Sequence, residues 1–254
     1  MSHLRCENVT VRFGGVVACN NINLEIPEGK IVGLIGPNGA GKTTLFNVLN
    51  RFQEYEFGHI YYRDQIIDNM KPHEMVTLGM ARTFQNANLF SEQSTLDNIL
   101  IGAHRHMGNP FTNMFSLPEA RRNEALLVDK AVAIADMLHL SEELDNPVKN
   151  LSYGYRKRVE LARALATEPE MILLDEPVAG CNEETTRELE DIVRHINQKL
   201  GVTIIVVEHD MSMVMRVCDH IYVINFGSNL ANGTPAEVRA NPDVIAAYLG
   251  EATQ

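Results

Sequence analysis

The chain has 254 residues, of which 45% are hydrophobic, and its formal net charge is −11 at pH 7. This length allows one large α/β domain or two small lobes, and the acidic balance argues against a broad nucleic-acid-binding surface. No pair of the four cysteines has C-x-x-C spacing, and no apolar run approaches the roughly 20 residues of a membrane-spanning helix. We therefore expect a soluble, globular protein without a zinc site or a disulfide framework.

The N-terminal third is predicted to be rich in β-structure. Turn residues at 27–30 follow one strand-like stretch, and Arg63 and Asp64 join two others in a predicted hairpin. The apolar run 31–35 predicts a buried strand, and a helix is expected to begin near Leu45. The other strand-like stretches are 9–13, 22–26, 59–62 and 65–67.

A middle region, at about 94–150, is predicted to be mostly helical. A loop-like stretch at 109–113 precedes a long amphipathic run from Pro118 to Leu140. Six apolar residues are expected to share one face of that helix, namely Leu126, Leu127, Ala131, Ile134, Ala135 and Leu138.

From Met171 onward, strand-like and helix-like segments alternate. This alternation implies a largely parallel sheet with helices on its faces, so the helical middle region is expected to be inserted into one α/β fold. The predicted strands are 171–174, 203–207 and 221–225, and the predicted helices are about 183–199 and about 211–217.

The stretch from Gly36 to Thr44 fits the phosphate-loop pattern G-x-x-x-x-G-K-[ST]. It lies between a predicted strand and a predicted helix, which is the context that a true phosphate loop requires. Lys42 would reach the β- and γ-phosphates and the Thr43 hydroxyl would bind Mg²⁺, whereas without a ligand the stretch would be only a glycine-rich turn. The predicted nucleotide-binding residues of this loop are Gly36, Pro37, Asn38, Gly39, Ala40, Gly41, Lys42, Thr43 and Thr44.

Two acidic residues end the apolar strand that begins at Met171. Ligands of open α/β sheets bind at the carboxyl ends of the strands, so Asp175 is expected to hold the Mg²⁺ shell. Glu176 is expected to orient or polarise the attacking water. Alone, this pattern would fit a strand that ends in solvated acids, and the phosphate loop in the same chain favours the functional interpretation.

A helical run at 156–167 follows Leu151-Ser152-Tyr153-Gly154, where Ser152 is a good N-cap and Gly154 permits close approach of a ligand to the backbone. Here the sequence resembles the ATP-binding-cassette ATPase family, whose signature motif is usually L-S-G-G-Q. Further motifs of that family match in order along the chain: Gln85 at its Q-loop, Ala179-Gly180-Cys181-Asn182 at its D-loop and His209 at its switch histidine.

The resemblance covers nearly the whole chain and implies a fold class. It is an α/β P-loop NTPase with a mostly parallel core sheet, an antiparallel β subdomain and an inserted α-helical subdomain. We expect one ATPase domain over 1–254, in which 1–93 and 151–254 form the nucleotide-binding core with the β subdomain. The helical subdomain is expected at about 94–150.

The resemblance also implies roles for the site residues. ATP and Mg²⁺ are the expected cofactors, with Thr43, Gln85 and Asp175 near the metal. Two ATP molecules would lie in a head-to-tail dimer, each between Lys42 of one subunit and the signature residues Ser152 and Gly154 of the other. The residues expected to act in catalysis are Glu176, His209, Lys42 and Gln85.

Phe13 stands where the family places an aromatic ring on the adenine, although a core strand residue is an equally good interpretation. The signature departs from the family pattern at Tyr153 and Tyr155, and the D-loop departs at Asn182. Because Ser152 and Gly154 are kept, we expect activity, with an altered affinity for nucleotide and less certain communication between the two ATP sites.

The segments of finer resemblance point to the larger ATPase subunit of branched-chain amino-acid importers. That resemblance implies separate transmembrane permease subunits, a second cassette ATPase of the same or a related chain, an extracytoplasmic solute-binding protein and no nucleic acid. The chain is then expected at the cytoplasmic face of a bacterial inner membrane. These segments are 81–86, 117–122, 208–211, 241–244 and 248–251.

Four alternatives stay open at this point. Related importers serve amides, urea or aromatic acids, and a lipopolysaccharide-type exporter has a cassette of similar size, although the long segment 105–125 argues against the exporter. A soluble cassette protein of DNA repair or translation would usually carry two cassettes, a zinc insert or long coiled coils. A P-loop kinase is disfavoured by Ser152-Tyr153-Gly154 and His209.

Overall fold

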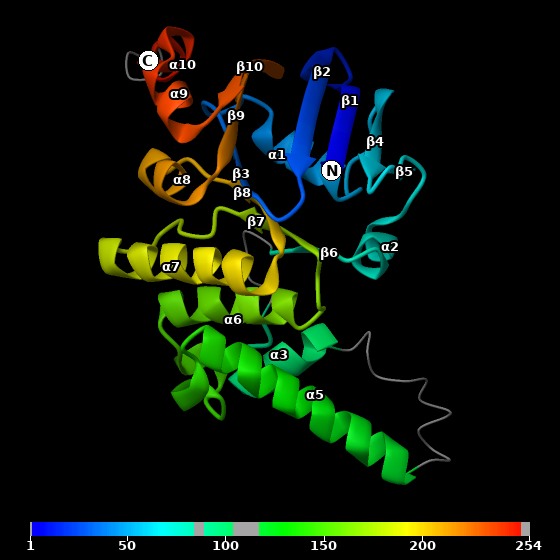
Figure 1. The fold of residues 1–254 in the computed structure, drawn as a ribbon, viewed down its shortest axis with the longest axis vertical. Helices are drawn as coiled ribbons and strands as arrows, with labels where there is room; N and C mark the ends of the chain where they lie inside the picture. The colour runs from blue at the N-terminus through cyan, green and yellow to red at the C-terminus, as the bar shows by residue number, and fades with distance from the viewer. Residues whose placement is uncertain (1, 84–88, 104–116, 250–254) are drawn as a thin grey trace.

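A computed structural model describes residues 2–83, 89–103 and 117–249, and for 117–121 it describes the backbone only. Its larger sheet has six strands in the order β10-β9-β3-β8-β7-β6 (Figure 1). Neighbouring strands are parallel except for the antiparallel pair β9 and β10. The strands are β3 (Ile31–Ile35), β6 (Met80–Arg82), β7 (Met171–Asp175), β8 (Thr203–Val207), β9 (His220–Asn225) and β10 (Ser228–Gly233).

The smaller sheet is antiparallel, with the strand order β2-β1-β4-β5. Its two long strands form a hairpin whose connection consists of two glycines, Gly14 and Gly15, and Gly14 takes a left-handed conformation with φ +58°. The strands are β1 (Ser2–Phe13), β2 (Val16–Pro27), β4 (Phe57–Tyr62) and β5 (Gln65–Ile66).

The helices cover the sheets and extend beyond them at one end, where α5 projects away from the rest of the chain (Figure 1). Short 3-10 turns at Ser141–Glu143 and Val148–Asn150 connect α5 to α6. The α-helices are α1 (Lys42–Leu49), α2 (Pro72–Thr77), α3 (Thr95–Gly102), α5 (Leu117–Met137), α6 (Tyr153–Leu165), α7 (Glu183–Leu200), α8 (Met211–Val217), α9 (Pro235–Ala240) and α10 (Pro242–Leu249).

The parallel sheet separates two hydrophobic clusters. Ile172 and Leu174 of β7 pack into the cluster that contains residues of α5, α6 and α7, whereas Met171 and Leu173 pack into the cluster shared with α1 and the antiparallel sheet. Successive side chains of a strand point to opposite faces, so the continuous apolar run of β7 is buried on both sides. Because β7 is buried on both faces, its position in the sheet is fixed, and so is the position of Asp175 at its end.

Most of the elements predicted from the apolar pattern are confirmed, with differences at their ends. The helix expected over 156–167 begins earlier, at Tyr153, because the Ser152 side chain caps its N-terminus. It ends at Leu165. The helix expected from Pro118 to Leu140 ends at Met137. Leu126 is predicted to share one face with Leu127 and Ala131, but this is wrong, because its side chain is 54% exposed. Leu127 and Ala131 are buried, and Leu126 lies about 100° away from Leu127 around the helix.

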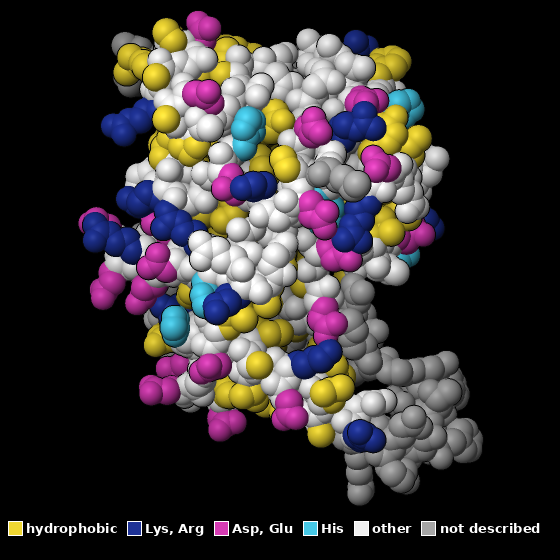
Figure 2. All heavy atoms as spheres, in the orientation of Figure 1, with side chains coloured by type: hydrophobic (Ala, Val, Ile, Leu, Met, Phe, Trp, Pro, Cys, Tyr) yellow, Lys and Arg dark blue, Asp and Glu magenta, His cyan; other side chains and the backbone are white. Residues whose placement is uncertain are grey.

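In the described part of the chain, no helix is long and apolar enough to cross a membrane. On the face that Figure 2 shows, Lys and Arg side chains are interspersed with Asp and Glu side chains. That face therefore lacks the continuous basic area that a nucleic-acid-binding surface presents.

His3 connects the antiparallel sheet to the parallel sheet. Its side chain is almost completely buried, with Nδ1 2.6 Å from the Thr203 hydroxyl and Nε2 3.1 Å from the Tyr62 hydroxyl. Burial lowers the pKa of His3, and the positive charge of Arg63 lowers it further, while Glu28 and Glu170 oppose the shift. The folded chain therefore favours the neutral imidazole.

Acidification is expected to destabilise the fold through His3. Because the lowered pKa belongs to the folded state, the contribution is complete above the ordinary pKa of about 6.5 and is lost as the pH falls below it. Urea unfolding of the parent and of His3→Gln, at a pH of about 7.5 and about 5.5, measures the effect. The parent should lose more free energy of unfolding between the two pH values than the variant, and equal losses would show that His3 does not carry the dependence.

Candidate functional site

The phosphate-loop residues form a tight turn between β3 and α1. A Cβ atom at Gly36 would lie 2.0 Å from the carbonyl oxygen of Ile224, and one at Gly41 would lie 2.4 Å from that of Ala18. Gly41 is the N-cap of α1, has φ +100° and makes no side-chain capping bond. Glycine is required at these two positions because a Cβ atom would clash with a backbone carbonyl oxygen. Gly41 has no side chain that could accept hydrogen bonds from the first N–H groups of α1.

Lys42 points back into the loop that precedes it. Its side chain is buried, and Nζ donates hydrogen bonds to the carbonyl oxygens of Gly36 at 2.6 Å and Pro37 at 2.9 Å. Asn38, Gly39 and Thr43 are exposed beside it. The loop thus holds an ammonium group where a polyphosphate would bring negative charge.

Asp175 ends β7 and lies in an ion pair. Its Oδ2 accepts a hydrogen bond from Nη2 of Arg82 at 2.8 Å, and Nη1 of Arg82 donates to the side chain of Asn47 at 2.7 Å. Asp175 is 5% exposed, so burial raises the pKa of its carboxyl, while Arg82 opposes that shift. Arg82 therefore compensates a carboxylate that would otherwise be costly to bury.

Glu176 and His209 come together at the same edge of the sheet. The Nδ1 atom of His209 lies 3.8 Å from Oε1 of Glu176. Glu176 has a left-handed backbone with φ +47°, and its N–H donates to the carbonyl oxygen of Val207 at 2.9 Å. A left-handed conformation costs a non-glycine residue about 1–3 kcal/mol, and here it aims the carboxylate away from the strand direction and toward the loop that follows β8.

Glu208 lies directly before His209 and is completely buried. Its Oε1 accepts a hydrogen bond from the backbone N–H of Val178 at 3.1 Å, and its Oε2 accepts from those of His209 at 3.0 Å and Asp210 at 3.2 Å. Burial raises the pKa of Glu208, and these three N–H groups oppose the shift. The carboxyl group joins the loop after β7 to the loop after β8.

The signature residues lie at the start of α6, against the start of α7. The Ser152 hydroxyl oxygen accepts a hydrogen bond from the Tyr155 N–H at 3.4 Å, which is long for such a bond. A Cβ atom at Gly154 would lie 2.7 Å from Cγ2 of Thr185. Ser152 is exposed and Gly154 is half-buried, so the helix N-terminus is accessible to a ligand.

The structure brings some of the predicted site residues together and keeps others apart. Figure 1 shows α1, which Lys42 begins, well separated from α6, which follows Ser152, with β7 and α7 between them. Phe13 ends β1 and is 49% exposed, so the alternative of a core strand residue is wrong. Gln85 lies outside the described residues.

Three contacts of the site were missed by reasoning from the sequence: Arg82 with Asp175, Glu208 with Val178, and the Tyr153 hydroxyl with Ala179. Arg82 and Glu208 lie within the segments 81–86 and 208–211, in which the sequence assigns roles only to Gln85 and His209. For Glu208 the available signal was its place directly after the predicted buried strand 203–207, because a charged group at the end of such a strand needs a partner.

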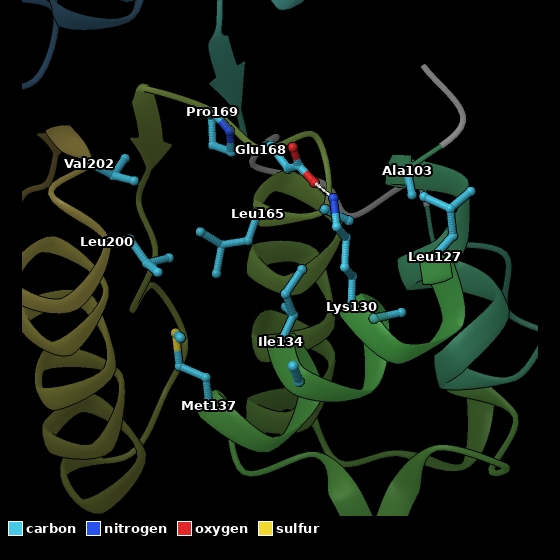
Figure 3. A pocket seen from close by; sticks show the side chains of 13 residues that line it. Ala103, Leu127, Lys130, Ile134, Met137, Leu165, Glu168, Pro169, Leu200 and Val202 are labelled. Atoms are coloured by element: carbon cyan, nitrogen blue, oxygen red, sulfur yellow. Dashed lines mark hydrogen bonds and ion pairs between the residues drawn. The ribbon is translucent and has the colours of Figure 1, made fainter. Parts of the chain in front are cut away.

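A separate, largely apolar cavity of about 410 Å³ lies between α5, the end of α6 and the segment that joins α7 to β8 (Figure 3). Lys130 and Glu168 form an ion pair at this cavity. Its lining does not include Lys42, Glu176 or His209, and it lacks the convergent polar groups that bind phosphates.

In the architecture described above, a phosphate loop, a strand-end carboxylate pair and a histidine meet at one edge of a parallel sheet, and a serine-capped helix lies elsewhere in the chain. That arrangement defines an ATP-binding cassette. A family described as ABC transporter matches residues 19–179, and one described as branched-chain amino acid ATP-binding cassette transporter matches residues 228–253. The chain belongs to the ABC transporter family and is an ATPase of the cassette type.

Curated relatives and solved structures match over almost the entire chain. The high-affinity branched-chain amino acid transport ATP-binding protein LivG of Escherichia coli K12 is 42% identical over 98% of both chains. The corresponding protein BraF of Pseudomonas aeruginosa is 41% identical, also over 98% of both chains. The ADP conformation of an ATP-binding cassette of an ABC transporter superposes with a TM-score of 0.86 at 33% identity, covering 98% of this chain and 99% of that one.

Removing the partner of Asp175 is expected to destabilise the protein. Arg82→Gln leaves a buried carboxylate without its counter-ion, which costs about 3 kcal/mol, and Arg82→Lys should cost less because it keeps a positive charge. Chemical unfolding measures both variants. The deficit of Arg82→Gln should shrink as the pH falls, because protonation of Asp175 removes the buried charge. A deficit that is independent of pH would show that the loss comes from packing alone.

Proposed function

We propose that this chain is the ATPase subunit of a membrane importer for branched-chain or related amino acids. The observation that supports this best is the match of residues 228–253 to the branched-chain amino acid cassette family, since this segment lies outside the general cassette match at 19–179. Relatives with transport names extend over 98% of the chain. The C-terminal match favours amino-acid uptake over the amide, urea, exporter and non-transport alternatives.

The nucleotide would lie over the phosphate loop, where the α1 N-terminus and Lys42 carry positive charge. The polyphosphate would replace the carbonyl groups of Gly36 and Pro37 as the partner of the Lys42 ammonium. Phe13 would stack on the adenine. ATP is thereby held by backbone N–H groups at its phosphates and by one aromatic face at its base.

The donor set fits Mg²⁺. In the described part of the chain, no three His, Cys, Asp or Glu side chains cluster as a metal site. Mg²⁺ does not need such a cluster, because it keeps several waters and binds through substrate phosphates and one or two protein oxygens. Thr43 and Asp175 would supply those oxygens, with Gln85 as a further ligand, and the ion would neutralise charge on the β- and γ-phosphates.

Glu176 and His209 would carry the hydrolytic step. Glu176 would accept a proton from the water that attacks the γ-phosphorus, while the bond from that phosphorus to the bridging oxygen breaks and leaves ADP and inorganic phosphate. His209 would contact the γ-phosphate and hold the water between itself and Glu176. The distance of 3.8 Å between Nδ1 of His209 and Oε1 of Glu176 supports a common role for the two side chains at one reacting centre.

The working assembly would contain two cassettes in head-to-tail orientation. Since α1 and α6 lie apart in one chain, Ser152 and Gly154 would complete the site of a partner cassette, which is a second copy or a related chain. Separate permease subunits would form the transmembrane pathway, and an extracytoplasmic solute-binding protein would deliver the amino acid. The chain would lie at the cytoplasmic face of a bacterial inner membrane.

Glu176→Gln is expected to abolish turnover and to retain ATP. Removing a general base lowers kcat by about 10²–10⁴-fold, whereas the phosphate-binding groups stay intact. Release of inorganic phosphate and retention of labelled ATP on the protein measure the two effects. Glu142→Gln makes the same change at an exposed residue outside the site and is the matched control. Rapid hydrolysis by Glu176→Gln would remove Glu176 from the role assigned here.

Partner capture tests the transport function. Tagged Glu176→Gln is expressed in its native host, the membranes are solubilised gently with ATP present, and the proteins that co-purify are identified. We expect two polytopic permeases and a second cassette, and capture should fail when Lys42→Ala is added to the same chain. Recovery of only soluble proteins or nucleic acid would overturn the transport function and leave the ATPase assignment intact.

A further inference from the structure

The apolar cavity of about 410 Å³ has the size and lining of a small-molecule site. Its volume lies toward the lower end of the range of ligand pockets, which is about 300–1,000 Å³. Aliphatic side chains line most of it, and several are only partly covered by the rest of the chain: Ile134 and Met137 are half-buried, and Leu200 is 48% exposed. A ligand with a short aliphatic group would cover these side chains and remove its own apolar surface from water.

One ion pair stands at the cavity. Figure 3 shows Lys130 and Glu168 on one side and Met137 and Leu200 on the opposite side. Both charged side chains are half-exposed, so a ligand reaches them without disturbing the core. An exposed ion pair contributes little to stability, and its two members can therefore exchange partners at a small cost in free energy.

The backbone of Glu168 is strained. It has φ +51°, and its N–H donates to the carbonyl oxygen of Leu165 at 2.8 Å just after α6 ends. Glycine or asparagine usually occupies a left-handed position at a helix end, and a longer side chain is disfavoured there. Strained residues of this kind cluster at binding sites, where the side chain is needed at one place.

The two charges select the class of ligand. A ligand with only a carboxylate would take Lys130 away from Glu168, and a ligand with only an amine would take Glu168 away from Lys130. A zwitterion pairs with both, its carboxylate with the Lys130 ammonium and its ammonium with the Glu168 carboxylate, and the site stays neutral. An aliphatic amino acid combines these two charges with an apolar group on one carbon atom.

We propose that this cavity binds a branched-chain amino acid as its zwitterion. The ammonium and carboxylate lie between Lys130 and Glu168, and the side chain points toward Met137 and Leu200. The binding itself needs neither ATP nor a permease. Its role rests on the proposed function, because the ligand belongs to the class of solute that the importer would deliver to the side of the membrane where the ATPase lies.

The cavity touches the far ends of two elements that carry site residues. α6 follows Ser152 and ends at the cavity with Leu165, and β7 begins just after the cavity residues 168–169 and ends at Asp175. A bound amino acid contacts α5, the end of α6 and the segment that joins α7 to β8, and it resists their relative movement. In the proposed assembly Ser152 approaches and leaves the partner's ATP in each cycle, so the ligand slows hydrolysis as the solute accumulates.

The test begins with calorimetric titration of the purified full chain. A ligand as small as leucine should bind with a Kd of about 0.1–1 mM. Isocaproate lacks the ammonium of leucine, isoamylamine lacks its carboxylate, and alanine lacks its branched side chain. Each of the three should bind at least about tenfold more weakly than leucine.

Neutralising one charge should change the preferred ligand. In Glu168→Gln, leucine should bind about tenfold more weakly and isocaproate should bind as tightly as leucine. In Lys130→Gln, isoamylamine should bind as tightly as leucine. Lys149→Gln and Glu92→Gln neutralise another exposed ion pair and are the matched controls, which should bind leucine as the parent does.

Filling the cavity should abolish binding. Ala133 is exposed and lines the cavity, so Ala133→Phe places a ring there, whereas Val132→Phe adds a ring at the next exposed position of α5, outside the lining. Leucine should bind to Val132→Phe and not to Ala133→Phe. In the captured membrane complex, leucine should slow ATP hydrolysis by the parent and by Val132→Phe, and this loss should be absent from Ala133→Phe.

Each contrary outcome bears on a separate claim. No saturable binding of leucine to the folded parent would overturn the inference and leave the transport function standing. Isocaproate or isoamylamine binding to the parent as tightly as leucine would overturn the zwitterion, and full binding to Ala133→Phe would overturn the location. Hydrolysis that leucine does not slow would overturn the feedback. A complex that does not hydrolyse ATP contradicts the proposed function, whatever the titration shows.

Discussion

Parallel pairing of β3, β7 and β8 is the constraint on which the rest of the site depends. Val207 of β8 lies opposite Leu34 of β3 and opposite Asp175 of β7, so the three strands end at the same level of the sheet. The residues that follow them are the phosphate loop, Glu176, and Glu208 with His209. Chemistry-bearing groups from three distant parts of the chain therefore meet at one edge, without any of them having to reach across the core.

Three charged groups at that edge are buried, and each is held by a specific partner. Lys42 donates to loop carbonyls, Asp175 pairs with Arg82, and Glu208 accepts three backbone N–H groups. A buried charge is costly unless it is paired, so these contacts also keep the surrounding loops in one conformation. The strained backbone of Glu176 persists because those loops hold it in place.

The sequence predicted those parts of the structure that are encoded locally. The apolar runs of β3, β7 and β8 are continuous patterns, and the structure confirms these three strands. The spacing of the phosphate loop is likewise a local pattern. β6 has only three residues and β10 is polar, so neither has a recognisable pattern. The contacts of Arg82, Glu208 and Tyr153 join residues far apart in the chain, and their geometry follows from tertiary packing that no local pattern specifies.

Native mass spectrometry of the solubilised Glu176→Gln complex, with ATP and Mg²⁺ present, shows whether two chains share each ATP. We expect two cassettes with two bound ATP molecules. Adding Ser152→Arg should separate the cassettes, while this chain keeps the ATP at its own phosphate loop. A stable pair of cassettes in the presence of Ser152→Arg, or loss of ATP from the same chain that carries the substitution, would contradict a shared ATP site.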